Sequence, residues 1–421
     1  MKYVLIGNSA AAIGAVEGIR KVDKKGTITI LSDEPYHTYS RPLISYYLAD
    51  KVTEDQMRYR PEDFYALHGV QFLGGRKALA VKTGEKTVVT AEGDIPYDKL
   101  LIATGSKPIV PPVPGLDREG VYTFIKFDDV KKIKEVAAPG KRAVVVGAGL
   151  IGMKAAEALV QCGVETTVLD LSDRILSSIL DTRAAEMVKA HAETKGVAFK
   201  LNNTVVEVRG DNKVSSVLLK DNNELPCDIV IVAIGVTPNL DVIKESDIKY
   251  NRGILVDEKM QTSVPDVYAA GDVSEGYDLL YGGQRVLPIL PNAYMQGEIA
   301  GQAMAGAEVQ FGGGFAFNAI GLFGLPMNTA GIANPEGSEY EIMVDESSQD
   351  KCYRKIVLKN DRVVGFILLN SIDRSGILTG LIREQADVKA FKQDLIRQDF
   401  GYIHFAPDVR KAKLTGGKAG D

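Results

Sequence analysis

One stretch near the middle of the chain constrains its fold more than any other. Val144 to Val146 form an apolar, β-branched strand pattern that runs straight into a glycine-rich turn. The residues of the turn and of the helix start after it are Gly147, Gly149, Leu150, Ile151 and Gly152. The spacing G-x-G-x-x-G permits a tight turn, a close backbone approach to a pyrophosphate and close packing of helix on strand. The N–H groups at the start of the helix can then bind phosphate.

A second strand pattern, Glu165 to Leu169, ends on Asp170. Its distance from the turn is close to the roughly 20 residues expected for an acid that binds a ribose. The stretch therefore predicts a dinucleotide site, and an ordinary glycine-rich turn between strand and helix is the alternative.

A weaker version of the same unit opens the chain. Val4 to Ile6 form the strand, and a helical pattern runs on to about Arg20. The turn between them contains Gly7, Ser9, Ala10, Ala11 and Ala12. Ser9 and Ala12 replace the second and third glycines, and because both are small, close backbone approach survives. The next strand, Thr27 to Leu31, leads to Asp33 and Glu34, either of which can accept hydrogen bonds from ribose hydroxyls; a solvated turn before Pro35 is the alternative.

Composition limits the other classes of function. The 421 residues suffice for two or three domains, and a net charge of −5 without a dense basic run argues against nucleic-acid binding. We expect neither a signal peptide nor a membrane span, because the chain opens directly on a strand pattern and no apolar run is long enough. Its three cysteines are far apart and fit reduced thiols in the cytoplasm. No set of residues has metal-ligand spacing, so we expect no metal.

Three further stretches complete a recognisable order. A strand pattern ends in the turn Ala103, Thr104 and Gly105; a similar strand ends at Gly235; and a third is followed by Gly271 and Asp272. With the two glycine turns, the chain resembles the two-dinucleotide-fold flavoprotein reductases, which include rubredoxin and ferredoxin reductases, NADH oxidases and apoptosis-inducing factor. Stretches near Ser9 and Arg41 are also similar to reductases associated with carbon monoxide dehydrogenase. The resemblance covers roughly residues 1–310.

This resemblance implies an α/β fold with two Rossmann-like dinucleotide-binding domains, the NAD domain inserted in the FAD domain, and a C-terminal α+β domain. The expected limits are 1–111 and 246–320 for the FAD domain, 112–245 for the NAD(H) domain, and 321–421 for a C-terminal interface domain. A hairpin is expected over Tyr353–Leu369, then helical patterns from Gly376 and Asp387, and a disordered tail from Lys411.

The resemblance also implies two cofactors, FAD and NAD(H), and assigns residues to them. Asp33 would bind the adenosine ribose, Arg41 the pyrophosphate region, Ala78 the adenine through its backbone, and Asp272 the ribityl chain. The remaining residues implied around the flavin are Gly7, Ser9, Ala10, Ala11, Glu34, Ala103, Thr104, Gly105, Gly271, Asn292 and Ala293. Those implied around the nicotinamide nucleotide are Gly147, Gly149, Leu150, Ile151, Gly152, Asp170 and Gly235.

Departures from the family pattern narrow the chemistry. Arg41 stands where peroxide- and disulfide-reducing relatives carry a redox cysteine, so those reactions lose their nucleophile. Tyr46 replaces a lysine near flavin N5, and Lys154 replaces the glutamate that pairs with that lysine. The hypothesis is that Lys154 supplies the positive charge near N5 or the carboxamide, with Tyr46 beside the site; a solvated helix lysine is the alternative.

The chain is therefore expected to be an FAD-dependent NAD(H):acceptor oxidoreductase that exchanges electrons with an iron–sulfur protein of the ferredoxin or rubredoxin kind. Two alternatives stay open: an NADH oxidase that uses oxygen directly, and an NADH-sensing flavoprotein that acts by interaction. The sequence leaves the direction of electron flow open, and a homodimer is a possibility it does not decide.

Overall fold

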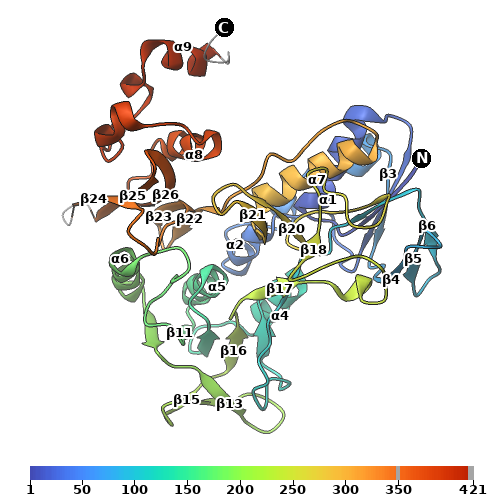
Figure 1. The fold of residues 1–421 in the computed structure, drawn as a ribbon. Helices are drawn as coiled ribbons and strands as arrows, with labels where there is room; N and C mark the ends of the chain where they lie inside the picture. The colour runs from blue at the N-terminus through green and yellow to red at the C-terminus, as the bar shows by residue number, and fades with distance from the viewer. Residues whose placement is uncertain (348–350, 416–421) are drawn as a thin grey trace.

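The computed structural model describes residues 1–347 and 351–415. Its first sheet is parallel, with strand order β19-β7-β1-β2-β3. The strands are β1 (Lys2–Ile6), β2 (Thr27–Ser32), β3 (Val70–Gly74), β7 (Lys99–Ile102) and β19 (Val267–Ala269). Val4 of the central strand pairs with Thr29 on one side and Leu100 on the other. Because β19 follows the whole second sheet in the chain, the first sheet is built from two distant segments (Figure 1).

Two helices cover one face of this sheet and lie side by side in Figure 1. They are α1 (Ala10–Val22) and α7 (Leu290–Met304). Alanines and glycines at their contact let the backbones approach closely: a Cβ built on Gly297 would lie 1.9 Å from the Ala11 carbonyl oxygen, and one on Gly14 2.3 Å from that of Tyr294. The small residues that close the first turn thus also fix the crossing of α1 with α7.

The second sheet repeats the same parallel order, β12-β11-β10-β16-β9. Its strands are β9 (Val121–Thr123), β10 (Arg142–Val146), β11 (Glu165–Asp170), β12 (Val197–Leu201) and β16 (Ile229–Val232). The helices of this unit are α4 (Phe127–Val136), α5 (Leu150–Gln161) and α6 (Thr182–Glu193). Residues 143–146 and 229–232 are buried, as expected for parallel strands covered on both faces.

Smaller elements join the two units. Antiparallel sheets are formed by β4 (Ala78–Lys82), β5 (Thr87–Thr90) and β6 (Ile95–Pro96); by β13 (Val205–Arg209), β14 (Ser216–Leu219) and β15 (Glu224–Pro226); and by β20 (Ser274–Asp278) with β21 (Gly283–Val286), joined in parallel by β18 (Ile254–Leu255). The connecting ribbon is β8 (Ser106–Pro108) with β17 (Val236–Pro238). Short helices α2 (Ile44–Leu48) and α3 (Phe64–Leu67) and 3-10 turns at Arg41–Leu43, Asp55–Met57 and Asp241–Ile243 complete this part.

The C-terminal part is a five-stranded antiparallel sheet with order β22-β23-β26-β25-β24. Its strands are β22 (Phe317–Leu322), β23 (Leu325–Gly331), β24 (Glu341–Ser347), β25 (Cys352–Lys359) and β26 (Arg362–Leu369), and they are followed by α8 (Ser375–Glu384) and α9 (Pro407–Thr415). In Figure 1 this sheet lies next to α5 and α6 of the second unit. One buried cluster continues across that boundary, from Met153 and Leu159 of α5 to Met327 and Ile367 of the sheet.

The expected hairpin is confirmed, but two expectations for the C-terminus are wrong. The pattern from Asp387 does not form an α-helix: residues Lys389–Asp394 are 3-10 turns with a kink at Phe391, and a further 3-10 turn follows at Tyr402–His404. The tail from Lys411 was expected to be disordered, yet residues up to Thr415 form the end of α9. Residues 416–421 lie outside the described part of the chain. A run of charged residues without regular periodicity hid a helix that begins at Pro407, a residue suited to a first turn.

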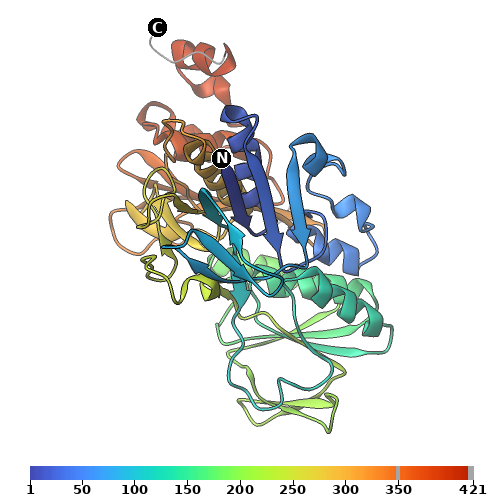
Figure 2. The ribbon, with the colours of Figure 1, turned by 90° about the vertical axis from the view of Figure 1, so that its right-hand side faces the viewer.

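The predicted fold class is confirmed. Two parallel sheets of Rossmann-like order are present, the second between the segments that build the first, and an α+β unit follows (Figure 2). Among the described residues, no helix has the length and apolar character that a membrane span requires.

Candidate functional site

The turn after β1 has the geometry that its sequence predicts. Gly7 has φ of +119°, and a Cβ there would lie 2.2 Å from the carbonyl oxygen of Ala103, so only glycine fits. Its N–H donates to Leu31 at 2.8 Å. Ser9 caps α1 with its backbone, but its side chain makes no capping hydrogen bond. The Ser9 hydroxyl and the first N–H groups of α1 are thus available to bind a phosphate.

Gly271 and Asp272 lie against this turn. A Cβ on Gly271 would be 3.3 Å from Ala11 Cβ and 3.4 Å from Ala293 Cβ, so both helix starts meet at this glycine. Asp272 Oδ2 accepts a hydrogen bond from Ser106 Oγ at 2.8 Å. Burial raises the pKa of the Asp272 carboxyl, and the Ser106 hydrogen bond and the charge of Arg41 offset this only in part. A half-buried carboxylate with so few donors fits a ligand rich in hydroxyl groups.

The Ala103–Gly105 turn connects the two units. Thr104 Oγ1 donates to the Asn239 carbonyl at 2.7 Å, and the Asn239 N–H donates to Gly105 at 2.8 Å. Gly105 has φ of +64°. The turn therefore both ends β7 beside Gly7 and fastens the strand that returns from the second unit.

The two acids after β2 have different surroundings. Glu34 is buried and accepts hydrogen bonds from Arg41 at 2.6 Å and from the Tyr39 hydroxyl at 2.8 Å. Arg41 also donates to the Ile125 carbonyl at 3.0 Å. Asp33 is exposed and pairs with Lys126. Of the two ribose candidates, Asp33 is thus the accessible one, while Glu34 holds Arg41 in place.

Two other residues expected to contact the flavin, Ala78 and Asn292, are buried. Ala78 opens β4 and is buried. Asn292, in the first turn of α7, is 1% exposed and donates through Nδ2 to the Phe315 carbonyl at 3.1 Å. Its side chain therefore orders the start of α7.

In the second glycine turn, close contacts exclude a Cβ at two glycines. Gly147 has φ of +110°, and a Cβ on it would lie 2.3 Å from the Ala233 carbonyl oxygen. A Cβ on Gly152 would lie 1.9 Å from the Gly147 carbonyl oxygen, whereas Gly149 faces open space. Packing thus requires glycine at Gly147 and Gly152, and Gly149 leaves the N-terminus of α5 accessible to a pyrophosphate.

Asp170 lies at this turn. Its two carboxylate oxygens accept hydrogen bonds from Ala148 N at 2.6 Å and Ser172 N at 2.7 Å. Gly235, with φ of +124°, ends the neighbouring strand and accepts a hydrogen bond from Ile109 N at 3.0 Å. Asp170 therefore holds the end of β11 against the glycine turn, where an acid could bind a ribose.

Lys154 and Tyr46 are brought together from different units. Lys154 Nζ lies 4.6 Å from the centre of the Tyr46 ring, donates to the Gly321 carbonyl at 3.2 Å and pairs with Glu157. The Lys154 side chain is 15% exposed, so the alternative of a solvated helix lysine is wrong. Glu157 Oε1 in turn accepts the Phe323 N–H at 2.7 Å. The cluster joins α2, α5 and the β22–β23 turn.

Several contributors were not predicted. Ser106, Glu157 and Gln296 all make hydrogen bonds that order the sites; Gln296 Oε1 accepts the Gly271 N–H at 2.8 Å. Glu157 follows Lys154 by three residues, so the usual i,i+3 pairing on a helix could have identified it. Ser106 and Gln296 form hydrogen bonds with residues far away in the sequence, so no local sequence pattern indicates their roles.

The thiols of Cys162 and Cys227 are less acidic than the thiol of a redox nucleophile. Burial raises the pKa of Cys227 to about 12 and also raises the pKa of Cys162. None of the three cysteines forms a disulfide, and Cys162 Sγ donates to the Leu48 carbonyl. Within residues 1–347 and 351–415, no group of three or more potential ligands could hold a metal ion.

The residues present fit the two implied cofactors. Both turns combine glycines that packing requires with an accessible helix N-terminus, the arrangement that a dinucleotide pyrophosphate needs. Beside the first turn, the half-buried Asp272 carboxylate suits a polyhydroxylated chain. The two sites lie on separate sheets joined by β8 and β17, so one chain can hold two dinucleotides.

Comparisons with known proteins agree with this geometry. The family model described as pyridine nucleotide-disulphide oxidoreductase matches residues 1–297, and that described as rubredoxin NAD+ reductase C-terminal domain matches residues 318–386. The epsilon subunit of NADH-dependent phenylglyoxylate dehydrogenase of Aromatoleum evansii is 30% identical, over 94% of this chain and 94% of that protein. An NAD-dependent persulfide reductase of A. fulgidus has a similar structure, with a TM-score of 0.87, 28% identity, and coverage of 99% of this chain and 84% of that chain.

A nitrite reductase [NAD(P)H] of Bacillus subtilis (strain 168) is 32% identical over 92% of this chain, which spans about half (48%) of that protein's length. The predicted oxidoreductase class and the predicted cofactors, FAD and NAD(H), are confirmed by the family match. Because the matched segment contains both phosphate-binding turns and covers well over half of the sequence, the chain belongs to the pyridine nucleotide-disulphide oxidoreductase family.

Proposed function

We propose that the protein is an FAD-dependent NAD(H):acceptor oxidoreductase that exchanges electrons with an iron–sulfur protein of the ferredoxin or rubredoxin kind. The observation that carries the proposal is the pairing of two pyrophosphate turns, one per sheet, in a chain without an activated cysteine beside them. The match of residues 318–386 to the rubredoxin NAD+ reductase C-terminal domain supports the choice of acceptor.

The first unit would hold FAD. Gly7, Ser9 and the start of α1 would bind its pyrophosphate, Asp33 its adenosine ribose and Asp272 its ribityl chain. Arg41 is fixed by Glu34 and would add positive charge near the pyrophosphate. When bound, FAD accepts a hydride from the nicotinamide and passes electrons on singly.

The second unit would hold NAD(H). Gly147, Gly149 and the start of α5 would bind the pyrophosphate, and Asp170 the ribose. Lys154 lies on the first turns of α5, where its charge would be close to the nicotinamide end, and Tyr46 would form the wall opposite it. Glu157 orients Lys154 and neutralises much of its charge.

We further propose the domain limits given by the sequence: 1–111 and 246–320 for FAD, 112–245 for NAD(H), and 321–421 for the interface domain. The strand order, in which β19 returns to the first sheet, supports this division. A cytoplasmic location is supported by three cysteines that form no disulfide. A homodimer stays a prediction that sedimentation velocity would test.

An acceptor assay tests the function. The purified protein is expected to be yellow with one FAD per chain and, under anaerobic conditions, to reduce rubredoxin or a ferredoxin with NADH, or NAD+ with the reduced acceptor. Oxygen consumption faster than reduction of either acceptor would instead identify an NADH oxidase. Slow turnover with every acceptor, together with an NADH-dependent change of mass, would identify a sensor. Absence of FAD after reconstitution would contradict all three.

The same proposal predicts the coenzyme. Asp170 would accept hydrogen bonds from a ribose 2′-hydroxyl and repel a 2′-phosphate, so kcat/KM should be higher for NADH than for NADPH by about tenfold or more. Asp170→Ala should narrow this ratio, mainly by raising KM for NADH. Equal values for the two coenzymes in the unmodified protein would contradict the assignment.

A further inference from the structure

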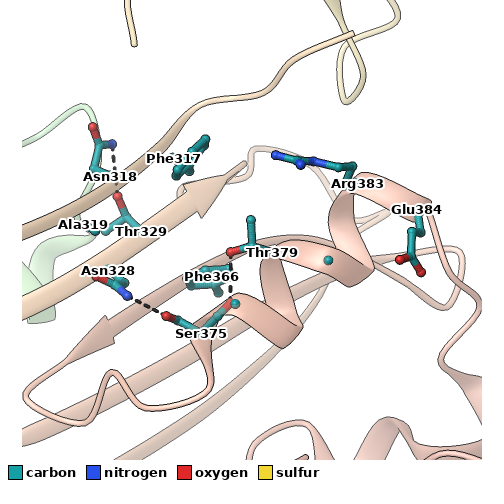
Figure 3. A pocket seen from close by; sticks show the side chains of 12 residues that line it. Phe317, Asn318, Ala319, Asn328, Thr329, Phe366, Ser375, Thr379, Arg383 and Glu384 are labelled. Atoms are coloured by element: carbon teal, nitrogen blue, oxygen red, sulfur yellow. Dashed lines mark hydrogen bonds between the residues drawn. The ribbon is translucent and has the colours of Figure 1, made fainter. Parts of the chain in front are cut away.

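A cavity in the C-terminal unit lies outside both dinucleotide sites. It has a volume of about 430 Å³ and lies between α8 and the strands β22, β23 and β26 (Figure 3). This volume is within the range of small-molecule sites. Its walls come from β22, β23, β26 and α8, and the proposed function uses none of the lining residues.

The side of the cavity formed by α8 is open because two of the residues that line it are glycines. Gly376 and Gly380 are four residues apart and both line the cavity, and a Cβ built on either would have no neighbour within 4 Å. Phe317 and the buried Phe366 line the opposite, sheet side. A flat apolar group would therefore fit between a glycine-lined helix and an aromatic wall.

Arg383 lies at one end of this cavity. It follows Gly380 by three residues on the same helix face, and in Figure 3 its guanidinium extends over the cavity toward Phe317. Within the described part of the chain, the Arg383 side chain has no ion pair or hydrogen bond. The neighbouring Glu384 is already paired with Lys413, so it does not neutralise Arg383. This end of the cavity is positively charged and able to bind a carboxylate in bidentate fashion.

Asn328 lies at the other end. Its Nδ2 donates to Ser375 Oγ at 2.6 Å, but its Oδ1 is buried and accepts no hydrogen bond from any described residue. A buried acceptor without a donor is destabilising, and a donor group of a ligand would satisfy it. Ser375 and Arg383 are eight residues apart, which is about 12 Å along the helix axis. The two polar ends are thus separated by the length of a small aromatic acid.

We propose that this cavity binds a small organic carboxylate with a flat apolar body and a hydroxyl or amino donor at the end opposite the carboxylate. Arg383 binds the carboxylate, Gly376, Gly380 and Phe317 enclose the flat body, and Asn328 Oδ1 accepts the donor hydrogen. The site is separate from the dinucleotide sites, so its occupancy does not require FAD or NAD(H) exchange.

The test uses the FAD-loaded full chain and three probes of one size: 3-(4-hydroxyphenyl)propionate, its neutral amide, and 3-phenylpropionate. Ligand-observed NMR titration is expected to give saturable binding of the first probe with Kd of about 1 mM. The amide should bind at least tenfold more weakly because it lacks the charge, and 3-phenylpropionate severalfold more weakly because it lacks the donor.

Variants then locate the site. Arg383→Gln should weaken the first probe about tenfold, and Gly380→Leu should abolish its binding by filling the cavity. Asn328→Ala should abolish the preference for the hydroxylated probe. Arg362→Gln, which alters an exposed arginine of the β25–β26 turn, is the matched control and should leave Kd unchanged.

FAD content should match the unmodified protein for Arg383→Gln and Gly380→Leu. The melting temperature should be unchanged for Arg383→Gln and no lower for Gly380→Leu, which separates loss of binding from loss of folding. No saturable binding, or binding that survives both substitutions, would overturn the proposal. Equal affinity for the two carboxylate probes would overturn the role of Asn328.

Discussion

Two charged side chains near the proposed cofactors are held in opposite ways. Lys154 is surrounded by partners, namely the Glu157 carboxylate, the Gly321 carbonyl and the Tyr46 ring. Asp272, in contrast, is half-buried with Ser106 as its side-chain donor. Lys154 therefore contributes to the stability of the folded chain. The Asp272 carboxylate would be stabilised by hydrogen bonds from a ligand.

Lys154→Met is expected to lower both stability and rate. It leaves the Glu157 carboxylate buried with only the Phe323 N–H as a partner, a loss of about 3 kcal/mol for a buried pair. If Lys154 also acts beside the nicotinamide, flavin reduction by NADH should slow in stopped-flow measurements, with FAD content unchanged. Lys154→Glu, which places two carboxylates together, should be worse in both respects.

The double variant Lys154→Met, Glu157→Gln separates these effects. Removing both charges should recover most of the lost stability, because no unpaired charge remains. A slow reduction rate that persists in the double variant would support the catalytic role of Lys154. A rate that recovers together with the melting temperature would show that Lys154 is structural.

Asp272→Asn is expected to stabilise the FAD-free protein while weakening FAD binding. Because burial raises the pKa of Asp272, the folded state holds the proton to higher pH than the unfolded chain does. Stability therefore falls as pH rises from the usual carboxyl value near 4, and the neutral amide removes that loss. Losing hydrogen bonds to a charged acceptor should weaken FAD about tenfold or more. Melting curves at pH 4 and 7 and titration of FAD measure the two effects; a less stable FAD-free variant at pH 7 would contradict the prediction.

Among the elements, glycines on helices have opposite roles. Gly297 of α7 lies against the Ala11 carbonyl of α1, and this contact fixes the helix start at the first phosphate turn. Gly380 of α8 faces the open cavity. The same residue type thus permits contact in one helix and leaves space in the other.

These two glycines predict substitutions of opposite sign. Gly297→Ala would place a Cβ 1.9 Å from a backbone oxygen and should cost about 3 kcal/mol, with loss of FAD. Gly380→Ala has nothing to displace and should stabilise α8 by about 1 kcal/mol through its helix propensity. Melting temperatures of the two variants measured side by side check this; a destabilised Gly380→Ala would mean that the cavity wall is tighter than it looks.

At the scale of the whole molecule, the C-terminal sheet is fastened to the second unit by a charged contact as well as by packing. Asp181, the N-cap of α6, accepts hydrogen bonds from Ala184 N at 2.9 Å, the Tyr353 hydroxyl at 2.7 Å and Lys355 Nζ at 2.9 Å. Burial raises the pKa of the Asp181 carboxyl, but these hydrogen bonds outweigh burial and hold the pKa below its usual value. Lys355 is 7% exposed, so this pair is well shielded from water.

Asp181→Asn should loosen this contact while keeping the helix cap, because asparagine caps as well as aspartate. The loss should be about 2 kcal/mol at pH 7. It should shrink progressively as pH falls below about 4, because the unfolded chain then binds a proton that the folded Asp181 carboxylate, with its lowered pKa, still resists. The control is Arg183→Gln, which breaks the exposed pair with Glu346 and should cost less than about 1 kcal/mol. Urea unfolding at the two pH values measures both; an equal loss at both would show that the charge of Asp181 is not the cause.

The sequence by itself determined the elements and the two turns. β-branched runs at Val144–Val146 and Val4–Ile6 lead into small residues, and such local patterns fix strand, turn and helix because the constraint is steric and lies within a few residues. The glycines of the two turns, Gly7 and Gly147, could thus be predicted without the fold, whereas the Ala103 and Ala233 carbonyl oxygens that exclude a Cβ there come from distant segments. The predictions from local pattern were wrong at the C-terminus. The irregular spacing of charged residues gave no indication of α9, and 3-10 turns are present where an α-helix was expected.

Only the tertiary structure decided which polar groups meet. Glu34 and Asp33 are neighbours in sequence, yet one is buried against Arg41 and the other pairs at the surface with Lys126. Ser106 reaches Asp272 across 166 residues, and Lys154 lies beside Tyr46 because α2 packs on α5. Burial and hydrogen bonding depend on contacts between distant segments, and no local pattern encodes them. The sequence therefore determined the two glycine turns at which we propose that phosphates bind, and the packing of the units determined which charges remain unpaired.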